Sequence, residues 1–186
     1  MLDEIVLPRS TPDRDSRYMG MAWITASFSK DPSTQVGAKI VTQDNEPLGS
    51  GYNGPARCVP DKCAPWHRPP KDDPNAFSKY DVVIHAEANA LDWSNPAKLP
   101  GAIIYVTAPP CPVCIKEISR KQLSKVVYWN YRGGGGMVSK ADEWLPKTLE
   151  YAKLAGIYMV EFQGNIDWVA DWTEHLKSLG ILKPSV

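Results

Sequence analysis

The chain has 186 residues, 43% of them hydrophobic, a size and composition that suit a single domain spanning residues 1–186. Lysine plus arginine number 21 and aspartate plus glutamate also 21, so the formal net charge is zero. This balance argues against a dedicated nucleic-acid binder, which normally carries a basic surplus, and favours a small-molecule ligand.

Hydrophobic periodicity and turn residues predict an alternation of helices and strands. In the first helix Met19, Ala22, Trp23 and Ala26 fall at helical spacing, and the helix is expected to end before Pro32. We expect helices at 14–30, 85–93, 111–123, 140–154 and 166–179, and strands at 36–42, 48–52, 102–107, 125–129 and 157–162.

This order predicts an α/β fold, with a first helix and a β-hairpin followed by alternating strands and helices. Such alternation is typical of parallel strands joined by helical crossovers, so we expect the last strand to be parallel to its neighbour. The predicted architecture is three-layer α/β/α, a five-stranded mixed sheet with helices on both faces and a core at about 15–165. Residues 53–80 form a long irregular loop, a feature that usually carries function, and Gly133–Gly136 indicate a flexible loop.

No stretch is apolar and long enough to cross a membrane, and the first ten residues lack a basic region followed by an apolar core. We therefore expect a cytoplasmic protein with no membrane partner, in which the four cysteines are thiols. In that compartment clustered cysteines more often bind metal or do chemistry than form disulfides.

The strongest signal is His85-Ala86-Glu87 followed by Pro110-Cys111-x-x-Cys114, the known signature of zinc-dependent deaminases. One histidine and two cysteines are ligands that zinc prefers, and three protein ligands leave a fourth position for water. Cys111 and Cys114 share a helix face in the first turn, where the helix dipole favours thiolate. His85 and Glu87 lie about 200° apart on an ideal helix, so they can serve one site only if His85 is at the helix start. Two helix N-termini should therefore face one metal, with Glu87 free to take a proton from its water.

Each half of this signature has another interpretation on its own. Cys111-x-x-Cys114 could belong to a structural zinc ribbon or a redox pair, and a lone histidine is more often a core residue. Their combination with Glu87 in a β-α-β-α context favours a catalytic zinc site.

With these residues placed, the sequence resembles the deoxycytidylate deaminases over about residues 15–165. The segments that carry the resemblance are Ser29–Pro32, Gln35–Ala38, Gly51–Gly54, Pro65-Trp66, Lys79-Tyr80, His85–Ala90 and Tyr105–Thr107 with the cysteine pair. The resemblance implies zinc-dependent hydrolysis of dCMP to dUMP and ammonia, which supplies dUMP for thymidylate synthesis. Water attacks C4 of the base, and Glu87 carries the proton to N3 and to the departing amine.

The resemblance also implies roles for residues that hold the substrate. Asn53 looks like the asparagine that holds the sugar, and Lys30 and Tyr128 are candidates for the phosphate. Each has a plainer alternative: Asn53 as a left-handed turn residue, Lys30 as a solvated helix-end cation, and Tyr128 as a core aromatic.

Many members of this family are hexamers that dCTP activates and dTTP inhibits, and the same control, with Mg²⁺ on the triphosphate, is expected here. The candidate effector residues are Gly51, Tyr52, Asn53, Gly54 and Arg57. Pro55–Cys58 departs from the family pattern, because Cys58 stands where a glycine is usual, and this puts the regulation in doubt but not the chemistry.

Cys58, Cys63 and His67 lie in one loop and are candidates for a second zinc site, although free thiols fit their loose spacing better. Rival functions are a deaminase acting on nucleic acid, a nucleoside or dCTP deaminase, and an inactive zinc-stabilised scaffold. Zero net charge argues against the first, and Glu87 against the last.

Overall fold

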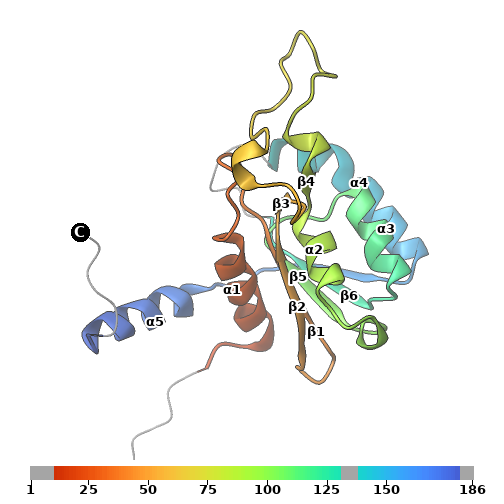
Figure 1. Ribbon diagram of the computed structural model, residues 1–186. Helices are drawn as coiled ribbons and strands as arrows, with labels where there is room; N and C mark the ends of the chain where they lie inside the picture. The colour runs from red at the N-terminus through yellow and green to blue at the C-terminus, as the bar shows by residue number, and fades with distance from the viewer. Residues whose placement is uncertain (1–10, 131–137, 181–186) are drawn as a thin grey trace, which may run out of the picture.

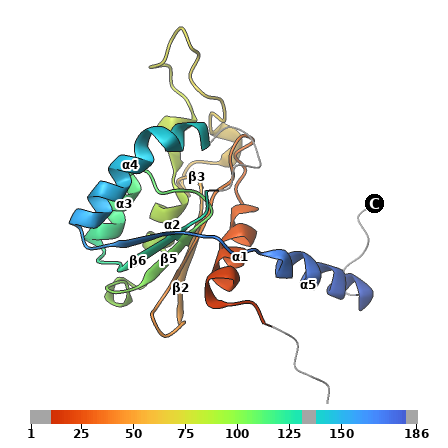
Figure 2. The ribbon, with the colours of Figure 1, turned by 180° about the vertical axis from the view of Figure 1, so that it is seen from behind.

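The computed structural model describes residues 11–130 and 138–180, so the predicted loop at Gly133–Gly136 lies outside the described residues (Figures 1 and 2). The helices are α1 (Arg14–Ala26), α2 (Ala86–Asp92), α3 (Pro112–Arg120), α4 (Val138–Leu154) and α5 (Asp167–Ser178). The strands are β1 (Gly37–Val41), β2 (Pro47–Tyr52), β3 (Gly54–Pro55), β4 (Val83–Ile84), β5 (Ile103–Val106), β6 (Lys125–Tyr128) and β7 (Tyr158–Glu161). Within these ranges no helix is both long and apolar enough to span a lipid bilayer.

Five strands form one mixed sheet in the order β2-β1-β5-β6-β7. β1 is antiparallel to both β2 and β5, whereas β5–β6 and β6–β7 are parallel. The predicted mixed sheet and its parallel last strand are therefore confirmed. The carboxyl ends of β5 and β6 lie together at one edge, and in an α/β sheet this is the edge where ligands bind.

The two faces of the sheet are covered by different helices, as the alternation along β5 shows. Ile103 and Tyr105 pack in the cluster that contains α1, whereas Ile104 and Val106 pack with α2 and α3. Figure 1 shows α2, α3 and α4 on one side of the sheet and α1 on the other. α5 extends away from the sheet in both views and contacts α1, where Trp168 donates a hydrogen bond to the Ser16 carbonyl at 3.1 Å.

α1 ends at Ala26, four residues before the predicted end at Lys30. The chain leaves the helix because Ser29 is buried and its hydroxyl donates to the Asn53 carbonyl at 2.7 Å. This contact joins residues far apart in sequence, so tertiary structure overrides the local helical pattern there.

The long loop is closed at its base by a second, two-stranded sheet; the segment before His85 is strand-like in sequence, but β3 and its pairing with β4 were not predicted. β3 and β4 pair antiparallel, Gly54 with Ile84 and Pro55 with Val83. Two-residue strands leave no detectable alternation, which explains the omission. Because β4 leads directly into α2, this pairing fixes the loop beside the start of that helix.

α2 packs directly on the backbone of β2, and Gly51 makes this approach possible. A Cβ atom at Gly51 would lie 2.3 Å from the Ala90 nitrogen and 2.4 Å from the Ala86 carbonyl oxygen. Gly54, three residues later, has no such close neighbour, since its nearest would be 3.8 Å away. Strand and helix therefore leave no room for a side chain at Gly51, whereas Gly54 has space for one.

Gly51→Ala is expected to lower the free energy of unfolding by about 1 to 3 kcal/mol, because two backbones must separate to admit the methyl group. Chemical denaturation measures the change, with Gly54→Ala as the matched control. A Gly51→Ala protein as stable as Gly54→Ala, within about 0.5 kcal/mol, would contradict this account of the packing.

Candidate active site

Three side chains with metal-binding atoms meet where α2 and α3 begin. His85 is the N-cap of α2, at the helix start as predicted. Cys111, which the sequence pattern placed in the first turn, is instead the N-cap of α3 and precedes that turn. The His85 Nδ1 atom lies 3.2 Å from the Cys114 Sγ and 3.5 Å from the Cys111 Sγ. The three ligand atoms all lie within 4.8 Å of one another, a spacing that one ion can bridge.

The three side chains of this cluster are coupled by hydrogen bonds that shift their pKa values. The Cys114 thiol donates to Cys111, and this bond, together with the hydrogen bond to His85, lowers the pKa of Cys111 to about 4. The hydrogen bond between His85 and Cys111 raises the pKa of His85 to about 9. The pKa of the Cys114 thiol is also raised, by its hydrogen bond to Cys111 and by burial. Without a metal, Cys111 is therefore a thiolate beside a protonated His85, and a bound metal ion would displace that proton. One nitrogen and two sulfur ligands fit zinc, with a fourth position left open.

Glu87 lies in the first turn of α2 beside this cluster, with 4% of its surface exposed. Burial raises the pKa of Glu87 above its usual value, because a low-dielectric surrounding disfavours the charged carboxylate. No basic residue forms an ion pair with Glu87 within the described part of the chain. A buried carboxyl that is free to gain and lose a proton is suited to general acid–base chemistry.

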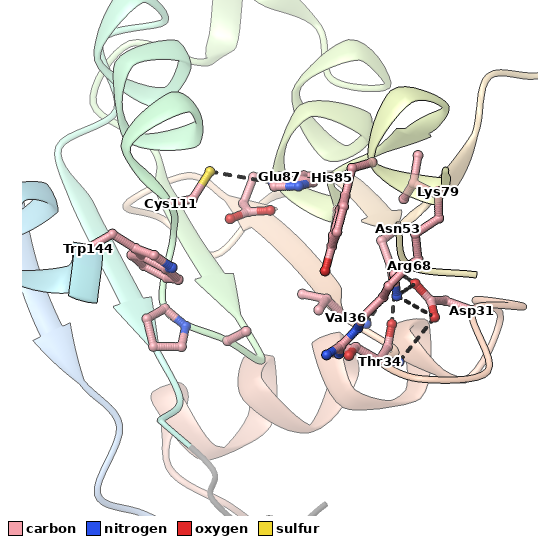
Figure 3. A pocket seen from close by; sticks show the side chains of 15 residues that line it. Asp31, Thr34, Val36, Asn53, Arg68, Lys79, His85, Glu87, Cys111 and Trp144 are labelled. Atoms are coloured by element: carbon pink, nitrogen blue, oxygen red, sulfur yellow. Dashed lines mark hydrogen bonds and ion pairs between the residues drawn. The ribbon is translucent and has the colours of Figure 1, made fainter. Parts of the chain in front are cut away.

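A cavity of about 260 Å³ opens next to these residues. Figure 3 shows His85, Glu87 and Cys111 at one end of it, which we call the metal end. Asp31, Thr34, Asn53, Arg68 and Lys79 line the other end, which we call the polar end. Trp144 of α4 contributes to the wall near Cys111. The cavity therefore combines a reactive end with an end suited to a polar group.

Asn53 lies at the polar end and is held firmly by the segment before β1. Its Oδ1 accepts from the Val36 N–H at 2.7 Å, and its Nδ2 donates to the Thr34 carbonyl at 2.9 Å. The alternative of a left-handed turn is wrong, because the non-glycine residues with positive φ in the described chain are Asn45 and Gln122. A direct role of Asn53 in holding the sugar stays a prediction.

A buried ion pair joins the long loop to the same segment. The Lys79 Nζ donates to both Asp31 carboxylate oxygens, at 2.9 and 2.7 Å, and to the Ser33 hydroxyl at 2.8 Å. Burial opposes ionisation of Asp31, but the bonds from Lys79 and Ser33 hold its pKa below the usual value. With side chains 6% and 3% exposed, Lys79 and Asp31 form part of the pocket's structure.

The structure does not bring Lys30 or Tyr128 into this pocket. Ser29 and Asp31 are both buried, so Lys30 between them points to the opposite side, where it pairs with Asp61. Tyr128 is buried in the core between the sheet and α2–α4, which confirms the alternative interpretation of Tyr128 as a core aromatic residue. Neither position supports the predicted contact with the substrate phosphate.

A second pocket, of about 510 Å³, lies on the other side of the Gly51–Gly54 segment. Gly51, Tyr52, Gly54 and Arg57 all line it, whereas Asn53 faces the first pocket. The Arg57 guanidinium lies 3.8 Å from the centre of the Trp93 ring, a cation–π contact. The segment thus contributes Asn53 to the first pocket and its other three residues to the second.

The second zinc site proposed from Cys58, Cys63 and His67 is not supported. Among the residues that the structure describes, His85, Cys111 and Cys114 form the one group of three or more metal-capable side chains. Cys58 and Cys63 are exposed free thiols. Backbone hydrogen bonds shape this loop instead, among them Lys79 N–H to the His67 carbonyl at 3.1 Å.

Sequence reasoning gave no role to Arg68, Lys79 or Trp144, although all line the pocket. Arg68 lies in a loop without periodicity and Trp144 in an amphipathic helix, so neither carries a local signal. Lys79 belongs to Lys79-Tyr80, one of the segments that resemble the deoxycytidylate deaminases, and this resemblance is the one sequence feature that points to it.

Comparisons with known proteins agree with this geometry. The deoxycytidylate deaminase of Mus musculus is 39% identical over 111 residues, which cover 60% of this chain and 61% of the mouse protein. The probable deoxycytidylate deaminase of Caenorhabditis elegans is 35% identical over 141 residues, 76% of this chain and 67% of the worm protein. The match thus spans only about three fifths of the mouse relative, 61% of its length.

The fold is shared with a solved structure, that of dCMP deaminase from the cyanophage S-TIM5 in complex with dCMP and dUMP. The TM-score is 0.59 at 23% identity, covering 82% of this chain and 99% of the phage chain. A family model described as the cytidine and deoxycytidylate deaminase zinc-binding region matches residues 12–130, more than half of the chain. Because that match includes His85, Glu87, Cys111 and Cys114, the chain belongs to the cytidine and deoxycytidylate deaminase family.

Proposed function

We propose that this chain is a zinc-dependent enzyme that hydrolyses dCMP to dUMP and ammonia, supplying dUMP for thymidylate synthesis. The observation that carries the proposal is the buried Glu87 beside the His85, Cys111 and Cys114 side chains at one end of a pocket. The names of the relatives, which are deoxycytidylate deaminases in mouse and worm, support dCMP as the substrate.

The protein's own residues supply binding, orientation and proton transfer. Zinc, when bound by His85, Cys111 and Cys114, lowers the pKa of a coordinated water and so provides a nucleophile at neutral pH. Glu87 would take one proton of that water and deliver it to N3 of the cytosine ring. It would then move the second proton, from the oxygen added at C4, to the amine, which leaves as ammonia while the C4 carbonyl forms. Its burial suits the first step, because a low-dielectric surrounding raises the pKa of the carboxyl and so makes its carboxylate a stronger base toward the water.

The second pocket is the proposed site of nucleotide control. Gly51, Tyr52, Gly54 and Arg57 line it, and Arg57 is a cation that a triphosphate with its Mg²⁺ could contact. We assign activation by dCTP and inhibition by dTTP to this pocket. Asn53, which lies between Tyr52 and Gly54 but lines the first pocket, offers a direct route from effector to substrate. Assembly into a homohexamer in the cytoplasm is part of the same proposal and rests on the family resemblance.

Ammonia release by the zinc-loaded protein tests the activity with dCMP, deoxycytidine and dCTP as alternative substrates. We expect dCMP to be the best of the three, with dCTP increasing and dTTP decreasing its turnover. Arg57→Gln should keep the basal rate and lose both responses, because it leaves the first pocket intact. No turnover of dCMP by zinc-loaded protein would refute the activity. Turnover without any response to triphosphates would refute the regulation alone.

A further inference from the structure

The polar end of the first pocket contains a cation, Arg68, that has no partner among the described residues. Arg68 lines the pocket and makes no hydrogen bond or ion pair within the part of the chain that the structure describes. Figure 3 shows its side chain beside Thr34 and Asp31, away from Cys111. A free guanidinium at the wall of a substrate pocket is positioned to bind an anion.

Lys79, the other cation at this end, is not available to a ligand. Its ammonium group already donates to the two Asp31 oxygens and to Ser33, which accounts for all three of its donors. Withdrawing it would leave the buried Asp31 carboxylate without a countercharge, which is strongly unfavourable. The ion pair also neutralises Asp31, so that carboxylate no longer repels an anion brought to Arg68.

The orientation of a nucleotide is fixed by the chemistry at the metal end. Deamination requires C4 of the base to face His85, Cys111 and Glu87, so the sugar and its 5′ substituent extend toward the opposite, polar end. Arg68 is therefore the free cation on the side where a 5′-phosphate arrives. A guanidinium presents a planar fork of donors that matches two phosphate oxygens at once.

We propose that Arg68 binds the 5′-phosphate of the substrate and makes the pocket selective for nucleoside monophosphates over nucleosides. This inference rests on the proposed function, because it uses the orientation that deamination demands. It also replaces Lys30, whose side chain lies in the second pocket, as the phosphate contact.

The test compares Arg68→Gln with Lys71→Gln, an exposed cation of the same loop that lines neither pocket. Two readouts are needed, kcat/KM for dCMP and deoxycytidine, and calorimetric binding of the products dUMP and deoxyuridine. Arg68→Gln should lower kcat/KM for dCMP and the affinity for dUMP by roughly 10- to 100-fold, the range of a lost charged hydrogen bond. Values for deoxycytidine and deoxyuridine should stay within about twofold, and Lys71→Gln should match the parent protein.

The outcomes separate this inference from the proposed function. If the parent deaminates dCMP but Arg68→Gln binds dUMP equally well, Arg68 is not the phosphate contact and the activity stands. Equal losses for nucleotide and nucleoside, or the same loss in Lys71→Gln, would also overturn the phosphate contact. If dUMP binding depends on Arg68 while dCMP is not deaminated, the phosphate contact holds and the proposed activity fails. A parent protein that does not bind dUMP overturns both.

Discussion

Replacing Glu87 by glutamine is expected to lower kcat for dCMP by at least about 10²- to 10⁴-fold, the range typical of a lost general acid–base group. Glutamine has nearly the same shape, but its amide can neither accept the proton of the attacking water nor protonate the departing amine. The substitution also replaces a buried ionisable group by a neutral one, so the free energy of unfolding should not fall. Loss of activity without loss of stability is therefore the expected combination.

Glu117→Gln is the matched control, because Glu117 is a surface carboxylate on α3 that pairs with Arg120 and lines neither pocket. Its kcat should equal that of the parent protein. Zinc content by elemental analysis should be unchanged in both variants, since neither residue belongs to the ligand cluster. A Glu87→Gln protein that keeps full zinc and more than about a tenth of the parent kcat would show that another group carries the proton.

The metal end could be predicted from the sequence because its geometry is local. His85 and Cys111 each precede a helix by one residue, and the first turn of each helix fixes where Glu87 and Cys114 point. Those helices in turn follow strands whose alternation and length are visible in the sequence, so the mixed sheet was predictable as well. Here local chemistry and global fold agree, and sequence patterns are reliable under that condition.

The polar end could not be predicted in the same way, because contacts between distant residues build it. Lys79 and Asp31 are separated by 48 positions, and no pattern in either segment signals that they pair. Ser29 and Asp31 are buried, and Lys30 between them points to the exposed side. This arrangement likewise depends on a distant residue, because Ser29 is held by Asn53, 24 positions away. The local sequence therefore predicts the wrong side of the segment for Lys30, which lines the second pocket.

Cys114→Ser is expected to lose both the metal and the activity, because it removes the most deeply buried of the three ligands. A hydroxyl is a poor replacement, since zinc binds thiolate and a serine hydroxyl stays protonated at neutral pH. Bound zinc also contributes to stability, because the unfolded chain does not present the ligands together. At a free zinc concentration about a thousandfold above the dissociation constant, that contribution is about 4 kcal/mol. The variant and the chelator-treated parent should therefore unfold at similarly lowered temperatures.

Cys63→Ser provides the control, because Cys63 is an exposed free thiol outside the ligand cluster. The parent and Cys63→Ser should each bind one zinc ion per chain, and Cys114→Ser should bind none, as elemental analysis of the purified proteins measures. Adding chelator should lower the unfolding temperature of the first two and leave that of Cys114→Ser unchanged, since there is no metal left to remove. If Cys114→Ser kept its zinc, the ligand set would be wrong. If the parent protein bound two zinc ions and Cys63→Ser only one, the loop that contains Cys63 would carry a second zinc site.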